Sequence, residues 1–127
     1  MENYFVIHGS FGSPFGNWFS WLYDFIEGEG KQVYVPDFPI GVGYQNYENW
    51  SKLLKYYLSL GLINENTTII GHSIAPVFIS NNDSYVNYES EKELANKIAT
   101  EQVFIPNAGH INSESGYDTF EEIVSYL

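Results

Sequence analysis

Residues 71–75 read GHSIA, which differs at one position from the G-x-S-x-G motif of a nucleophile elbow. In an elbow, a sharp turn between a strand and a helix holds the serine in a strained backbone conformation. The residues two before and two after the serine must therefore be small. Gly71 meets this requirement, and Ala75 replaces the usual second glycine with another small residue. The pattern predicts that Ser73 is a nucleophile.

A serine nucleophile needs a general base, and the base needs an acid that orients it. In proteins with this motif the partners follow in the order serine, aspartate or glutamate, histidine. Ser73, Asp83 and His110 occur in that order. We expect Ser73 Oγ to attack an acyl carbonyl, His110 to take its proton and later protonate the leaving group, and Asp83 to fix the imidazole.

The same chemistry needs backbone N–H groups that stabilise a developing oxyanion. We expect these from Ile74 and from one residue of the loop after Gly9, either Ser10 or Phe11. The residues expected to support the elbow and this loop are His8, Gly9, Gly71, His72 and Ala75.

Each of these features also has a simpler interpretation. A GHS sequence after a strand is compatible with an ordinary turn, and Asp83 after two asparagines is a good turn residue. His8 and His72 fit strand-end histidines with satisfied hydrogen bonds, and His110 fits a loop histidine. The three histidines also allow a metal site, although no pair at i, i+4 supports one. The joint order and placement favour catalysis, with no metal and no cofactor.

Strand-like and helix-like segments alternate along the chain. Strands are predicted at 4–7, 32–35, 67–70, 77–79 and 102–105, and helices at 17–28, 46–60, 90–98 and 117–127. The helix starts are predicted from Asn17 as a cap and from Ser90 and Glu93 as a capping box. This order predicts an α/β fold with a mostly parallel sheet of about five strands flanked by helices. In such sheets ligands bind beyond the carboxyl ends of the strands, where Ser73 also lies.

The composition favours one small domain spanning 1–127 and excludes several classes of function. The chain has 127 residues, no cysteine, 16 acidic residues and five lysines without arginine, for a net charge of −11. Nucleic acids and anionic membranes need a basic surface, so neither is expected as a partner. No signal peptide or membrane span is recognisable, so we expect a cytoplasmic protein with a small-molecule substrate.

Many segments match one family in order: 5–9, 12–14, 18–22, 35–39, 47–50, 71–76, 80–86 and 106–112. In these segments the chain resembles small α/β-hydrolases of the retinoblastoma-binding-protein-nine-like group. The resemblance implies a serine-hydrolase fold with Ser73, Asp83 and His110 as the triad. It also implies an esterase-like activity on a small ester or acyl compound through an acyl-serine intermediate.

The chain departs from that family directly after the elbow. Only six residues, 71–76, separate Ile70 from Val77, whereas a parallel crossover needs roughly a dozen or more. Family elements are therefore missing between about 76 and 77. Residues 77–80 can form a helical turn that completes the elbow, or a strand that is placed elsewhere or runs antiparallel. Alternatively, the chain can be an internally deleted relative with exposed apolar edges.

The missing helix should leave Ile69, Ile70 and Val77 less buried than usual. Self-association through this uncovered sheet surface is one expectation. The alternative function is that of an impaired or inactive hydrolase remnant that acts as a binding or interaction protein.

Overall fold

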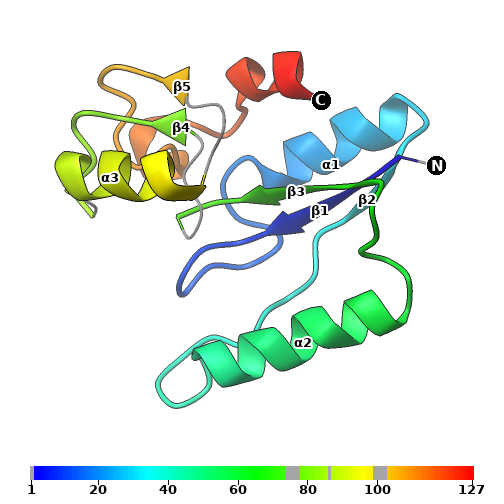
Figure 1. The fold of residues 1–127 in the computed structure, drawn as a ribbon. Helices are drawn as coiled ribbons and strands as arrows, with labels where there is room; N and C mark the ends of the chain where they lie inside the picture. The colour runs from blue at the N-terminus through cyan, green and yellow to red at the C-terminus, as the bar shows by residue number, and fades with distance from the viewer. Residues whose placement is uncertain (1, 74–77, 86, 99–102) are drawn as a thin grey trace.

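The computed structural model of the chain describes residues 2–73, 78–85, 87–98 and 103–127. Its main sheet has three parallel strands in the order β2-β1-β3 (Figure 1). These are β1 (Asn3–Ile7), β2 (Gln32–Tyr34) and β3 (Thr67–Gly71). The register pairs Phe5 with both Tyr34 and Ile69. The carboxyl ends of β1 and β3 therefore lie side by side.

The two faces of this sheet are covered by different helices (Figure 1). Side chains alternate along a strand, so Tyr4 and Val6 of β1 share one face. They join a core cluster with Leu22 of α1 (Phe19–Gly28). Phe5 points to the other face, where its ring meets Tyr57 of α2 (Tyr47–Ser59) at a centroid distance of 5.2 Å.

The two helices begin in different ways. Asn46 caps α2, with its Oδ1 accepting the Asn49 N–H at 2.9 Å. The prediction that Asn17 caps α1 is wrong, because the cap position is Trp18 and has no side-chain hydrogen bond. Asn17 instead adopts a left-handed backbone, and its Oδ1 accepts the Ser113 N–H at 3.2 Å. A tertiary contact thus replaces the local cap.

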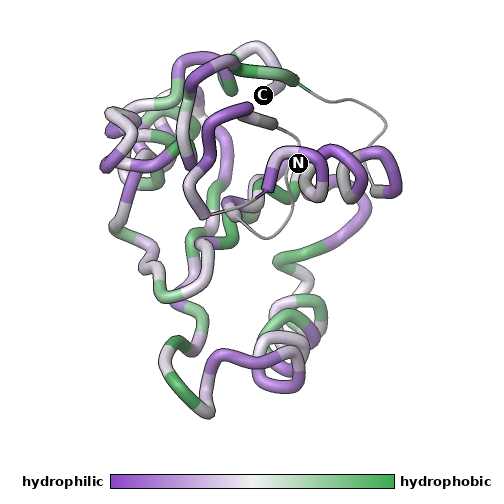
Figure 2. The backbone as a smooth tube through the Cα atoms, turned by 90° about the vertical axis from the view of Figure 1, so that its left-hand side faces the viewer, coloured by the Kyte–Doolittle hydropathy of each residue, from purple (hydrophilic) through white to green (hydrophobic). Residues whose placement is uncertain are grey.

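Helix α2 has no fully buried residue. Figure 2 shows hydrophobic and hydrophilic residues mixed on this helix, at the lower end of the molecule. It contacts the remainder mainly through Tyr57 and through Trp50, whose ring lies 4.7 Å from that of Phe38. Helix α2 therefore covers its face of the sheet loosely.

A second, smaller sheet holds the last two strands. It pairs β4 (Phe78–Ile79) with β5 (Val103–Phe104) in parallel, and α3 (Tyr88–Ile98) connects them. Of the alternatives for residues 77–80, the strand placed elsewhere is therefore the observed one. The five predicted strands are present and parallel, but they divide into sheets of three and two. Residues Val77 and Gln102 of the predicted strands lie outside the described residues.

Two predicted helix features are corrected by the structure. The capping box of Ser90 and Glu93 is wrong, because α3 begins earlier and Asn87 Oδ1 accepts the Ser90 N–H at 3.2 Å. The predicted α-helix at 117–127 is replaced by one 3₁₀ segment, η2 (Glu121–Tyr126), and a shorter one, η1 (Ser113–Ser115), precedes this region. Phe120 and Ile123 are buried at a spacing of three residues, which suits a 3₁₀ turn.

The outer side of β3 is uncovered, as the short crossover predicts. Ile69 is 54% exposed, and Ile70 is partly buried against the core. The prediction of reduced burial is confirmed for Ile69, whereas Val77 lies outside the described residues. Within the described ranges, no helix is both long and apolar enough to cross a membrane.

Candidate active site

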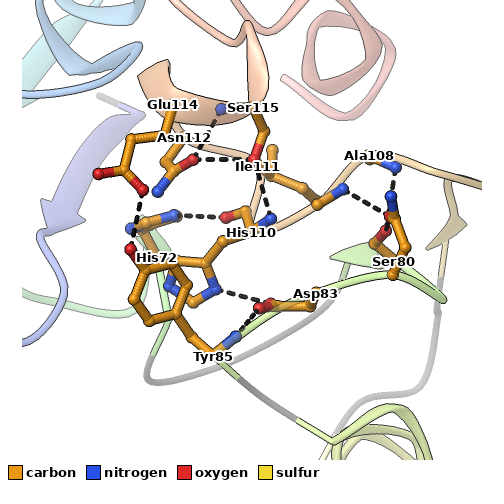
Figure 3. Close-up of polar contacts among 12 residues, drawn as sticks. His72, Ser80, Asp83, Tyr85, Ala108, His110, Ile111, Asn112, Glu114 and Ser115 are labelled. Atoms are coloured by element: carbon orange, nitrogen blue, oxygen red, sulfur yellow. Dashed lines mark hydrogen bonds and ion pairs between the residues drawn. The ribbon is translucent and has the colours of Figure 1, made fainter.

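The aspartate and histidine expected to work together are in contact. His110 Nδ1 lies 2.6 Å from Asp83 Oδ2, and the two side chains are only 13% and 5% exposed (Figure 3). The other oxygen, Asp83 Oδ1, accepts the Tyr85 N–H at 2.7 Å. This backbone contact fixes the carboxylate, which in turn orients the imidazole. A short, buried pair of this kind suits a general base and its orienting acid.

The loops that carry this pair are joined by side chains rather than by a long strand ladder. Three consecutive residues after β4 accept backbone N–H groups from the loop before His110. We call these residues, Ser80, Asn81 and Asn82, the polar clasp. Its contacts are Ser80 Oγ to Ala108 N at 3.0 Å, Asn81 Oδ1 to Asn107 N at 2.8 Å and Asn82 Oδ1 to Gly109 N at 2.8 Å.

The clasp is closed within itself, because Ser80 Oγ donates to Asn82 Oδ1 at 2.8 Å. It compensates for β4 and β5 being only two residues long. Sequence reasoning gave these residues no role of their own. The run of serine and asparagine after a strand was the available signal, because short polar side chains bond readily to nearby backbone groups.

The loop before His110 needs an unusual backbone. Asn107, Gly109 and Ile111 all have left-handed φ angles, at 58°, 59° and 51°. A Cβ on Gly109 would also collide with the Ser115 side chain. Ser115 Oγ accepts the His110 N–H at 3.2 Å. The loop is thus held on both sides of His110.

Ser73 stands just beyond β3 in the conformation expected of an elbow. Its φ is 69°, a left-handed value that non-glycine residues rarely adopt and that is found at functional turns. Ser73 is exposed and lines the same cavity of about 360 Å³ as Asp83 and His110. Among the described residues, Ser73 Oγ has no hydrogen-bond partner. In ligand-free enzymes, catalytic hydrogen bonds are often long and tighten when substrate binds.

The loop after β1 passes very close to the serine. A Cβ added to Gly9 would lie 2.8 Å from Ser73 Cβ and 3.2 Å from the His72 carbonyl oxygen. Only glycine therefore allows this approach. The Phe11 N–H donates to Gln45 Oε1 at 2.7 Å, a contact that sequence reasoning missed.

This contact separates the two oxyanion candidates of the loop. Within the part of the chain that the structure describes, the Ser10 N–H has no acceptor, so it is the more available of the two. Ile74 and Ala75, expected as oxyanion donor and elbow support, lie outside the described residues. Gly71 closes β3 as expected.

The two supporting histidines differ. His8 is fully buried and satisfied, because Nδ1 donates to the Gly9 carbonyl at 2.8 Å and Nε2 accepts the Phe38 N–H at 2.9 Å. The prediction of satisfied hydrogen bonds is confirmed for His8. For His72 it is wrong in part: Nε2 donates to the His110 carbonyl at 3.0 Å, while the buried Nδ1 has no partner among the described residues.

Burial lowers the pKa of His72, because a charged imidazole is poorly solvated there. The histidine therefore stays neutral, and its Nε2–H ties the elbow to the histidine loop (Figure 3). The described residues contain no group of three metal-ligating side chains. His8 in particular has both ring nitrogens engaged by backbone groups.

Comparison with known proteins gives one family match. Residues 74–127 match the model of the family described as Serine hydrolase. That segment contains Asp83 and His110 and begins one residue after Ser73. The search of curated proteins gives no match.

Two solved structures share the fold. The ydeN gene product of B. subtilis has a TM-score of 0.85 at 18% identity, over 100% of this chain and 97% of its own. A protein described as a YdeN-like hydrolase from Pectobacterium atrosepticum has a TM-score of 0.66 at 17% identity, over 99% and 89% of the two chains. The α/β fold class is therefore established by these structures, and the family match supports a hydrolase.

Proposed function

We propose that the chain is an esterase-like serine hydrolase that acts on a small ester or acyl compound. The observation that carries the proposal is the buried contact of 2.6 Å between His110 Nδ1 and Asp83 Oδ2, in a cavity that Ser73 also lines. The match of residues 74–127 to the Serine hydrolase model adds support. On the sequence resemblance, we also propose that the chain is a single cytoplasmic domain of the retinoblastoma-binding-protein-nine-like group.

In the first step His110 Nε2 takes the proton of Ser73 Oγ as that oxygen attacks the acyl carbon. Asp83 accepts a hydrogen bond from the His110 Nδ1–H and stabilises the imidazolium that forms. The tetrahedral oxyanion is stabilised by the backbone N–H groups of Ile74 and Ser10. Collapse breaks the bond to the leaving alkoxide, which takes the proton from His110 and leaves an acyl-Ser73 ester.

In the second step water attacks the acyl-serine carbonyl and gives a proton to His110. The intermediate collapses to a carboxylic acid, and Ser73 Oγ recovers its proton. His72 remains neutral throughout, and its Nε2–H stays bonded to the His110 carbonyl oxygen. No group beyond the chain and water is needed for this balance.

The test is intact-mass analysis after exposure to a fluorophosphonate, which phosphonylates an activated serine. We expect one adduct on the wild-type chain and none on Ser73→Ala. The matched control is Ser84→Ala, because Ser84 is an exposed serine beside Asp83 and should leave labelling intact. Absence of an adduct on a chain that circular dichroism shows to be folded would refute the proposal.

A second candidate is a non-catalytic remnant that binds a protein or a second copy of itself. The observation that favours it is the uncovered β3, where Ile69 is 54% exposed. An exposed strand edge is a template for pairing with another chain. Multi-angle light scattering tests self-association: a dimer that Ile69→Lys dissociates, on a chain that does not label at Ser73, would favour this candidate.

A further inference from the structure

The cavity at Ser73 continues away from the reacting atoms as an apolar groove along β3. Its floor runs back from Gly71 to Thr68, and its far end is formed by Tyr126 and Leu127. At roughly 3.3 Å per residue, that stretch of strand alone is about 10 Å long. The volume of about 360 Å³ lies within the range typical of small-molecule sites, roughly 300–1,000 Å³. The groove is thus larger than an acetyl group requires.

The groove walls come from both faces of the sheet. Phe120, Ile123 and Trp18 form one wall, and Trp50 and Leu54 of α2 form the other. Both indole N–H groups are already bonded, and because Trp18 is only 2% exposed, the indole carbon surface in the groove comes from the partly exposed Trp50. The bonds are Trp18 Nε1 to the Ile111 carbonyl at 3.0 Å and Trp50 Nε1 to the Pro39 carbonyl at 2.8 Å.

Most side chains that line the groove are uncharged. Among the described lining residues, Asp83 is the only side chain with a formal charge at neutral pH, and it is paired with His110. The described lining residues include no lysine, and Lys31 lies only beyond the far end, where its Nζ donates to the Leu127 carbonyl oxygen at 2.9 Å, so an anionic substrate tail along the strand has no partner. An apolar chain, by contrast, would lose only water contacts on binding.

We propose that this groove binds the acyl chain of the substrate, so that the enzyme prefers esters of medium-length linear fatty acids. The inference rests on the proposed function, because the acyl carbon must sit at Ser73 Oγ. From there a straight chain can follow β3 over Ile69 and Ile70, which the short crossover leaves open. An acyl chain that lies between the apolar walls buries more of its apolar surface with each added methylene.

The first experiment compares kcat/KM for nitrophenyl acetate, butyrate, octanoate and laurate with the full chain. A fully buried methylene strengthens binding roughly fourfold. Because the groove is partly open, each methylene gains less than this. We therefore expect kcat/KM for the octanoate ester to exceed that for the butyrate ester by about tenfold. Equal values, or a maximum at acetate, would overturn the inference while leaving Ser73-dependent hydrolysis intact.

A charge in the groove should remove the preference. Ile69→Glu should lower the ratio of octanoate to acetate kcat/KM by at least tenfold. Ile40→Glu is the matched control, because Ile40 is similarly exposed, at 42%, but does not line the groove. Ile69→Gln gives the same direction with less disturbance if the glutamate variant does not fold. An unchanged ratio in a folded variant would overturn the inference.

A binding experiment separates failure of the groove from failure of catalysis. Ser73→Ala is titrated with octanamide and acetamide while tryptophan fluorescence reports on Trp18 and Trp50. We expect saturable binding of octanamide, at least tenfold tighter than acetamide and weakened by Ile69→Glu. Binding without any hydrolysis by the wild type would refute the proposed function but keep the groove. Absence of octanamide binding would refute the groove.

Discussion

The N-terminal and C-terminal regions of the molecule position their active-site residues by different means. Up to Ser73, a ladder of three parallel strands with helices on both faces places the nucleophile and the Gly9 loop. After residue 78, two-residue strands would be weak guides, and the polar clasp holds Asp83 and His110 together. The comparison shows that a short sheet can still support a precise acid–base pair, if side chains supply the missing backbone contacts.

One contact joins the two regions directly at the site. His72 belongs to the elbow, yet its Nε2–H bonds to the His110 carbonyl. The indole of Trp18 makes a similar bond to the Ile111 carbonyl. The strand-built half and the clasp-built half are therefore coupled at His110 and at the residue that follows it.

The largest expected effect breaks the chemistry of the C-terminal region without changing its shape. Asp83→Asn should lower kcat/KM for nitrophenyl octanoate about thousandfold or more, because a neutral amide does not stabilise the imidazolium. Asp37→Asn is the control, since that exposed carboxylate lies near the buried His8 and does not line the cavity. A loss below tenfold, with the variant folded, would exclude Asp83 from the mechanism.

The next effect targets the N-terminal region. Gly9→Ala should lower kcat/KM about a hundredfold, because its Cβ would displace the loop that supplies an oxyanion donor. Gly28→Ala has no atom within 4 Å of the added Cβ and should leave activity unchanged. We expect that control to stabilise the fold by about 0.5–1 kcal/mol, since alanine suits a helix better than glycine. Equal activity of the two variants would contradict the expected role of Gly9.

The comparison itself is tested by one asparagine from each region. Asn82→Ala removes the acceptor of Gly109 N–H and should lower unfolding free energy by about 1–2 kcal/mol and kcat/KM about tenfold. Asn46→Ala removes the α2 cap and should cost about 1 kcal/mol with activity unchanged. Urea unfolding and initial rates measure both. Similar activity losses in the two variants would mean that the clasp has no special role.

The smallest effect is a pH dependence from the contact between the regions. The pKa of His72 is lowered by burial, so the folded chain resists protonation more than the unfolded chain. As the pH falls below about 6.5, the free energy of unfolding should therefore decrease, by at most about 1.4 kcal/mol per pH unit. His72→Gln should flatten this slope in urea titrations at pH 7.5 and 5.5. An identical slope in both proteins would assign the dependence to other groups.

The sequence by itself determined the types and order of the reactive residues. Gly71 and Ser73 after a β-rich run, followed by Asp83 and His110, predicted which groups share one end of the sheet. Local rules also predicted that the second helix begins near residue 46, where the Asn46 side chain makes its cap bond within four residues. Local rules were wrong at two predicted helix caps. The Asn17 side chain bonds to the distant Ser113 N–H instead, and Asn87 accepts the Ser90 N–H.

Only the tertiary structure decided how the short crossover is accommodated. Residue spacing excluded an ordinary parallel neighbour for β3, but the pairing of β4 with β5 depends on contacts between residues about 25 apart. Contacts between distant segments also produce three other features: the clasp, the Gln45 contact with the Phe11 N–H, and the groove over Ile69. Hydrogen bonds and burial between distant segments depend on three-dimensional packing, which no local pattern specifies.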